Sequence, residues 1–241
     1  MASVYPVIVD TPAQVTGMLD IILAHPGERL YIDLEGEQLS CRGTLDLISI
    51  HVEAAYQTWL VDVHTLGDCA FSTTATADGY TTLRSVPESV HRVKSVVDIQ
   101  LLELASRRGF KDRYLLGLSK CISRCDRIYA DEKARWQETK EKDRQLLLAN
   151  SELFRVRPLV QDTLLYCAGD VALLPRLLRQ FEPFPIGFWR WFAAKETRDR
   201  IKEAHENWYR PEGPEKADAP WIKGILIARK QEHKVETGRK A

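Results

Sequence analysis

RLYIDLEG, residues 29–36, is the most informative segment of this 241-residue chain. A β-favouring apolar run that ends at Leu34 predicts a strand, and Asp33 and Glu35 interrupt it just before a glycine. Because side chains alternate along a strand, the two carboxylates share one face of it. Neighbouring carboxylates repel each other unless a positive charge lies between them. The stretch therefore indicates either a cation site at a strand end or a solvated turn.

The residues on both sides of this stretch predict further strands. These cover residues 4–9, 44–52 and 57–64. A helix over residues 12–25, capped by Asp10 or Thr11, separates the first strand from RLYIDLEG. A short polar turn joins the last two strands, which is typical of a hairpin or meander.

The second half of the chain changes from strand to helix patterns. Residues 68–89 are rich in Ser, Thr and Gly and predict a loop with a short helix near its end. Helical patterns then cover residues 97–108, 117–125, 131–150, 157–181 and 190–209. Asp98 is the expected cap of the first of these helices. Three successive strands followed by helices predict a single mixed α/β domain.

The composition of the chain indicates the size of its core and the distribution of its charge. The chain is 44% hydrophobic, which suffices for one substantial core. Residues 1–100 carry 5 basic and 13 acidic side chains, whereas residues 101–241 carry 29 basic and 21 acidic ones. This asymmetry suits an acidic cation site beside a surface for a polyanion, and chance segregation of solvated faces explains it equally well.

Targeting and disulfide signals are not found in the sequence. The five cysteines are an odd number without paired Cys-x-x-Cys spacing, which argues against a disulfide framework and a structural zinc site. The first residues lack the basic and apolar segments of a signal peptide, and no window resembles a membrane span. We expect an intracellular protein, cytoplasmic or nuclear, that is neither secreted nor membrane-bound.

A second chemical motif lies in the helix predicted over residues 157–181. Tyr166 and Asp170 are four residues apart, so they lie on the same helix face. Asp170 stands in the apolar stretch AGDVALL, where a buried carboxylate is costly unless it is paired or binds a metal ion. If the helix meets the strand end, Asp33, Glu35 and Asp170 form a hard-oxygen site for Mg²⁺ or Mn²⁺ beside the Tyr166 phenol.

Each motif alone has a simpler explanation. Most Asp-x-Glu pairs at strand ends are solvated turns, and an isolated helical Asp170 is more often a surface acid. Together, and in the order strand then helix, the two motifs favour a shared site.

LYIDLEG and the segment RPL…LLYCAGDVALLPRLL resemble the first and last motifs of the DEDD-type 3′–5′ exonucleases, in the subclass whose last motif contains tyrosine. VVDIQLLELASR (97–108) and GLSKCI (117–122) also resemble connecting segments of the ribonuclease D-like branch of that family. The resemblance covers about residues 5–181, and residues 183–221 look like the C-terminal helix of fungal members. It implies a ribonuclease H-like mixed sheet flanked by helices. It also implies an exonuclease-like domain over residues 1–182, followed by a C-terminal helix and partly ordered tail over residues 183–241.

The resemblance also implies a two-metal hydrolysis of phosphodiester bonds in RNA or single-stranded DNA. Asp33 is then expected to bridge both ions, and Glu35 and Asp170 to hold the ion that activates the attacking water. Tyr166 is expected to orient that water. Two divalent cations on the order of 4 Å apart can generate a nucleophile at neutral pH and stabilise the leaving oxygen.

One family motif has no counterpart in this chain. An aspartate from a strand–helix unit is expected between the third of the consecutive strands and VVDIQLLELA, but only SVPESVHRVKS (85–95) occupies that interval. We therefore expect one strand–helix unit to be deleted, with VKSVV (93–97) a candidate to take the place of the missing strand. Asp78 and Asp98 are poor candidates to replace the missing carboxylate.

The sequence leaves two functions open. The first is a metal-dependent 3′–5′ exonuclease whose activity is impaired by the missing aspartate. The second is a catalytically inactive nucleic-acid-binding or scaffolding module, of the kind that a splice variant or truncated gene model would produce. A non-nuclease α/β protein requires both motifs to be coincidental.

Overall fold

The computed structural model describes residues 5–86, 96–107, 114–184, 186–220 and 225–238. The chain packs as two compact units. The first contains residues 1–94 and 129–175, and the second contains residues 95–128 and 176–241.

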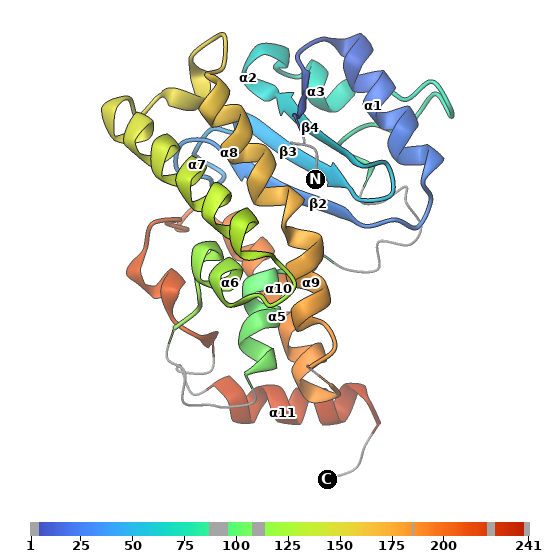
Figure 1. Cartoon of the computed structure of the whole chain (residues 1–241). Helices are drawn as coiled ribbons and strands as arrows, with labels where there is room; N and C mark the ends of the chain where they lie inside the picture. Colours follow the sequence, from blue (N-terminus) through green and yellow to red (C-terminus); the bar gives the residue numbers. More distant parts are fainter. Residues whose placement is uncertain (1–4, 87–95, 108–113, 185, 221–224, 239–241) are drawn as a thin grey trace. The chain divides into compact units, whose positions relative to one another are not determined.

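The first unit is built on a mixed β-sheet (Figure 1). Its described strands are β1 (Val7–Val9), β2 (Leu30–Glu35), β3 (Leu47–Val52) and β4 (Gln57–Asp62). They lie in the order β1-β4-β3-β2; β2, β3 and β4 form an antiparallel meander, and β1 pairs with β4 in parallel. The predicted run of three consecutive strands is therefore confirmed.

Two differences from the predicted elements lie between residues 62 and 72. β4 ends at Asp62, short of the predicted residue 64, because the Asp62 carboxylate accepts hydrogen bonds from the backbone and hydroxyl of Thr65 and caps α2 (Val63–Leu66). The loop predicted from residue 68 begins with the short helix α3 (Cys69–Ser72). The short helix expected near its end, and most of the interval 85–97, lie outside the described residues.

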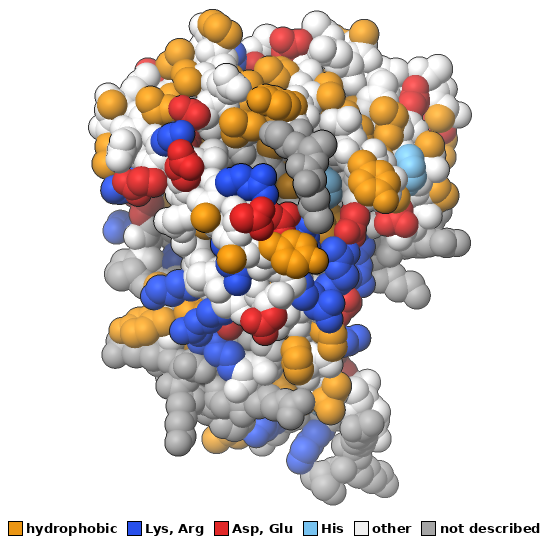
Figure 2. Space-filling model, in the orientation of Figure 1, with side chains coloured by type: hydrophobic (Ala, Val, Ile, Leu, Met, Phe, Trp, Pro, Cys, Tyr) orange, Lys and Arg blue, Asp and Glu red, His pale blue; other side chains and the backbone are white. Residues whose placement is uncertain are grey.

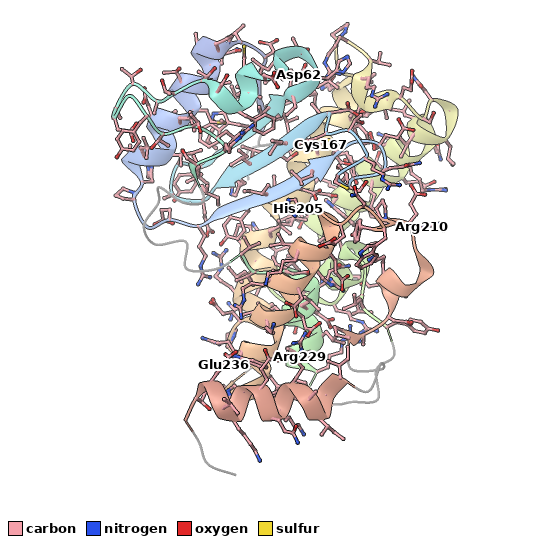
Figure 3. All side chains as sticks on the ribbon, turned by 180° about the vertical axis from the view of Figure 1, so that it is seen from behind. Asp62, Cys167, His205, Arg210, Arg229 and Glu236 are labelled. Carbon is pink, nitrogen blue, oxygen red and sulfur yellow. The ribbon has the colours of Figure 1, made fainter. Side chains whose placement is uncertain are left out.

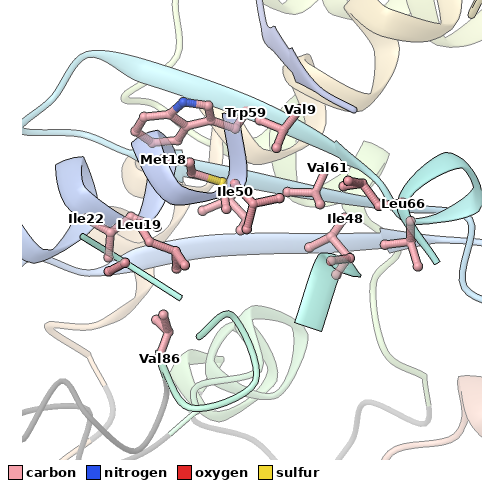
Figure 4. Packing of buried hydrophobic residues seen from close by; sticks show 14 of the residues in the cluster. Val9, Met18, Leu19, Ile22, Ile48, Ile50, Trp59, Val61, Leu66 and Val86 are labelled. Atoms are coloured by element: carbon pink, nitrogen blue, oxygen red, sulfur yellow. The ribbon is translucent and has the colours of Figure 1, made fainter. Parts of the chain in front are cut away.

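Helix α1 (Pro12–Ala24) covers one face of the sheet. Thr11 begins it with a capping box, in which its side chain and that of Gln14 each accept from the other's backbone amide. The helix buries Met18 and Leu19 against the sheet residues Ile50 and Val61, as Figure 4 shows. Burial of each such side chain contributes about 1.5–3 kcal/mol, so this core fixes the sheet from which the site is built.

Helix α8 (Gln161–Ala172) covers the opposite face, and α7 (Ala130–Ala149) packs alongside it (Figure 1). The prediction of a single helix over residues 157–181 was wrong, because α8 is followed by a separate helix, α9 (Leu174–Phe181). Pro175 explains the break: it has no backbone N–H to continue the ladder of α8, yet it fits the first turn of a new helix. The turn η1 (Leu153–Arg155) precedes α8.

The second unit is helical in its described residues. It contains most of α9, together with α5 (Ile99–Ser106), α6 (Leu118–Arg124), α10 (Phe188–Ala204), η2 (Pro214–Ala217) and α11 (Ile225–Glu236). Asp98 caps α5 as predicted, because it accepts from the amides of Gln100 and Leu101. Arg229, labelled in Figure 3, joins α11 to α10 through Glu196 and Asp199.

The helix predicted over residues 190–209 is α10, which ends at Ala204. The packing units do not follow the expected boundary at residue 182, because residues 95–128 pack with the C-terminal helices. The division into an exonuclease-like domain over residues 1–182 and a C-terminal segment over residues 183–241 stays a prediction. Among the described residues, every helix is too short or too polar to cross a membrane.

Candidate metal centre

Strand β2 supplies two carboxylates on the sheet face that α8 covers. Asp33 pairs with Ser49 of β3, and Glu35 pairs with Leu47. Directly paired residues share a face, and Leu47 packs in a cluster with Cys167 of α8. Asp33 and Glu35 therefore lie half-buried beneath α8.

Helix α8 brings the third carboxylate to the same place. One oxygen from each of Asp33, Glu35 and Asp170 lies within 4.8 Å of the other two. Asp170 is 2% exposed, and the Tyr166 hydroxyl one turn earlier donates a hydrogen bond to it. The structure thus brings together all four residues singled out in the sequence.

Helix α7 contributes a polar face to the same site. Trp136, Lys140 and Asp143 follow one another at intervals of four and three residues, so they lie on one side of α7. Trp136 Nε1 donates to Asp170 Oδ1 at 2.8 Å, and Lys140 Nζ lies 3.8 Å from Asp170 Oδ2. The ammonium also lies 4.9 Å from the ring centroids of both Trp136 and Tyr166. Asp143 is buried and accepts from Thr163 Oγ1 at 2.8 Å.

Gly169 allows this close approach of the two helices. A Cβ atom at this position would stand 3.2 Å from Trp136 Cδ1. A glycine inside a helix costs about 1 kcal/mol relative to alanine, and here it leaves room for the indole that binds the neighbouring Asp170.

Two arginines before α8 bind side chains at the end of β4 and in the connection between β2 and β3. Arg157 Nε and Nη2 bind both oxygens of Asp62, at the end of β4 and labelled in Figure 3. Arg155 binds Asp46 and the Thr44 hydroxyl in the connection between β2 and β3. These contacts fix the strand ends relative to the start of α8, so they position the carboxylates indirectly.

Burial and neighbouring negative charges raise the pKa values of the three acids. Burial, together with the charges of Asp33, Asp170 and Asp143, raises the pKa of Glu35 to about 9, and Lys140 offsets part of this shift. Burial, with the charge of Asp170, raises the pKa of Asp33 to about 6. Burial also raises the pKa of Asp170, although Lys140, Trp136 and Tyr166 offset part of the effect. A bound cation would reverse these shifts.

The donor set fits a hard divalent cation. Three carboxylates offer the oxygen ligands that Mg²⁺ and Mn²⁺ prefer. The hydroxyl of Ser49, beside Asp33 across the strand pair, is fully buried and has no hydrogen-bond partner in the described part of the chain. An unsatisfied buried hydroxyl on this face agrees with a site that is completed by a ligand or its water.

The other two aspartates considered as replacements serve local structure. Asp78 binds the backbone and hydroxyl of Thr81, within its own loop. Asp98 caps α5 and binds Arg200 at 2.6 Å. In the described residues, the acidic group therefore contains three carboxylates.

The sequence prediction missed the contribution of α7. The sequence pattern predicted a helix over residues 131–150 but gave it no part in the site, and its outer residues do pair with one another, as Lys142 does with Glu138. Acidic and basic side chains are correspondingly interspersed on the face shown in Figure 2. The available signal was the spacing of Trp136, Lys140 and Asp143, which places one aromatic residue in the middle of a charged helix.

The chain matches no protein-family model and no curated protein sequence. It does resemble solved structures. Trypanosoma brucei RNase D in complex with RNA U12 has a TM-score of 0.63 at 16% identity, covering 93% of this chain and 79% of that one. Its GMP complex has a TM-score of 0.62 at 17% identity, covering 92% and 71%. The catalytic core of RRP6 from the same organism has a TM-score of 0.52 at 14% identity, covering 91% and 56%.

These similarities concern the fold, because all the identities are low. They confirm the expected α/β class: the chain has a ribonuclease H-like mixed sheet flanked by helices, as in RNase D and RRP6 catalytic cores.

Proposed function

We propose that this chain is a metal-dependent 3′–5′ exonuclease that hydrolyses phosphodiester bonds from the 3′ end of RNA or single-stranded DNA. The observation that carries the proposal is the convergence of Asp33, Glu35 and Asp170 within 4.8 Å, with Tyr166 one helical turn from Asp170. The fold it shares with RNase D supports the choice of nucleic acid as substrate.

Each residue has a defined task in this proposal. Asp33, Glu35 and Asp170 hold Mg²⁺ or Mn²⁺, which when bound supplies a nucleophile at neutral pH and stabilises charge on the leaving oxygen. Tyr166 orients the attacking water. Burial and the neighbouring acids raise its pKa, so the phenol keeps its proton and remains a donor at neutral pH. Trp136 holds Asp170 in place through its indole N–H.

The second candidate is a catalytically inactive nucleic-acid-binding or scaffolding module. It is favoured by the number of acids: the described residues bring three carboxylates to the site, whereas the resemblance to the DEDD family implies four. Loss of one electrostatic contribution to the transition state lowers rates by about 10² to 10⁴, which would leave either a slow enzyme or a binding module.

One assay separates the two candidates. Single strands of RNA and DNA, labelled at either end, are incubated with the chain in Mg²⁺, Mn²⁺ or EDTA. An exonuclease gives metal-dependent laddering from the 3′ end, and this laddering is lost in Asp33→Asn. Retarded migration of intact strands, with no ladder in any metal, would establish the binding module instead. Glu28→Gln, at an exposed position, is the control for loss of an acidic residue.

A further inference from the structure

Lys140 brings a fixed positive charge into the acidic group. Its ammonium lies 3.8 Å from Asp170 Oδ2, and its side chain is 32% exposed. The charge acts on all three carboxylates, because it lowers the pKa of Asp33, Glu35 and Asp170 alike. Lys140 therefore belongs to the site electrostatically, although its side chain is partly exposed.

Neighbouring aromatic rings hold the ammonium in this position. Lys140 Nζ lies 4.9 Å from the ring centroids of Trp136 and Tyr166, within the range of cation–π attraction. Both rings are themselves held by Asp170, through the indole N–H and the phenol O–H. The lysine, the two rings and the carboxylate thus form one connected group across α7 and α8.

The charge balance limits how many cations this group can bind. Once a bound cation has displaced the proton of Glu35, three ionised carboxylates and one ammonium leave two negative charges, which one divalent ion neutralises. A second divalent ion would reverse the sign of the site and would lie close to the ammonium, at a cost set by like-charge repulsion. Asp143 binds Thr163 and lies outside the group of three. Its negative charge nevertheless also acts on Glu35 and Asp170, and Lys140 acts on Asp143 in turn. The count of two negative charges therefore refers to the three ligands and Lys140 alone, and a second ion would be repelled because the ammonium lies 3.8 Å from Asp170 Oδ2.

We infer that Lys140 takes the place of one of the two cations, so that the site binds a single divalent ion. This inference rests on the proposed metal-dependent function and specifies how it is carried out. A phosphate brought to the site would meet one metal ion and one ammonium group, so the ammonium would supply part of the positive charge of a second ion, for which the described residues bring no fourth carboxylate to the site.

The test is the stoichiometry and affinity of Mn²⁺ binding, measured by titration calorimetry on the full chain without nucleic acid. The wild type is expected to bind one Mn²⁺. Lys140→Gln is expected to bind Mn²⁺ about 10- to 100-fold more tightly, or to accept a second ion, because a nearby repulsive charge is gone. Lys140→Arg keeps the charge and is expected to behave as the wild type. Lys142→Gln, on the same helix but paired with Glu138 at the surface, is the matched control and is expected to leave binding unchanged.

Two results would overturn the inference: two Mn²⁺ ions bound by the wild type, or equal affinity in the wild type and Lys140→Gln. A different set of results would contradict the proposed metal-dependent function itself. In that case the wild type binds no Mn²⁺, or Asp33→Asn binds it as well as the wild type does. Thermal unfolding in EDTA checks that each variant is folded, and the wild-type and Lys140→Arg titrations decide the stoichiometry even where Lys140→Gln is unstable.

Discussion

Glu35 shows most clearly the electrostatic cost of burying three carboxylates close together. Its side chain is half-buried near two other carboxylates, and its pKa is raised from 4.5 to about 9. Between these two values the folded chain keeps a proton that the unfolded chain loses. The stability of the metal-free protein therefore falls as the pH rises through this range.

Replacement of Glu35 by glutamine is expected to weaken this pH dependence. In EDTA, the wild-type unfolding temperature should decrease between about pH 5 and pH 9, and the variant should show a flatter profile because glutamine does not titrate. Thermal unfolding followed by circular dichroism across this range measures the effect. Glu28→Gln, at an exposed position, should keep the wild-type slope. A variant slope as steep as that of the wild type would show that Glu35 is not the titrating group.

At the scale of elements, the segment before α8 fixes the helix to the sheet. Asp62 is 2% exposed, and both of its oxygens bind Arg157. Burial alone would raise the pKa of Asp62, but the bonds from Arg157 and Thr65 bring it below its usual value. The arginine thus compensates a charge buried at the end of β4.

Arg157→Ala is therefore expected to destabilise the chain by about 3–5 kcal/mol, because it leaves the Asp62 charge buried without its partner. Denaturant unfolding at neutral pH measures this loss. Arg144→Ala removes an exposed partner of Glu141 and should cost under about 1 kcal/mol. If the two substitutions cost the same, the contact between Arg157 and Asp62 does not anchor α8.

The same elements show what sequence patterns can and cannot predict. Alternation located β2, and the four-residue spacing placed Tyr166 and Asp170 on one face, because both depend on local geometry. The helix pattern over residues 157–181 continued past Pro175, so the break between α8 and α9 was missed. The contribution of Lys140 was missed for a different reason: the partner of a charged side chain depends on a long-range helix contact that periodicity does not encode.

In the molecule as a whole, β2, which carries Asp33 and Glu35, lies at the edge of the described sheet. In the described part of the sheet it pairs with β3 alone, and Ile32 and Leu34, which alternate with the two carboxylates, are 45% and 43% exposed. The family resemblance places a further strand beside the one that carries Asp33. The interval in which the missing unit was expected lies largely outside the described residues, so the deletion itself stays a prediction.

Asp33, Glu35 and Asp170 are proposed to support metal-dependent hydrolysis from a free 3′ end. Product analysis on two otherwise identical 5′-labelled RNA strands, one with a free 3′ hydroxyl and one with a blocked 3′ end, tests it most directly. With Mn²⁺, the wild type should release mononucleotides from the free-ended strand and leave the blocked strand intact, and Asp33→Asn should degrade neither. Degradation of the free-ended strand in EDTA, or equal degradation by Asp33→Asn, would contradict the account.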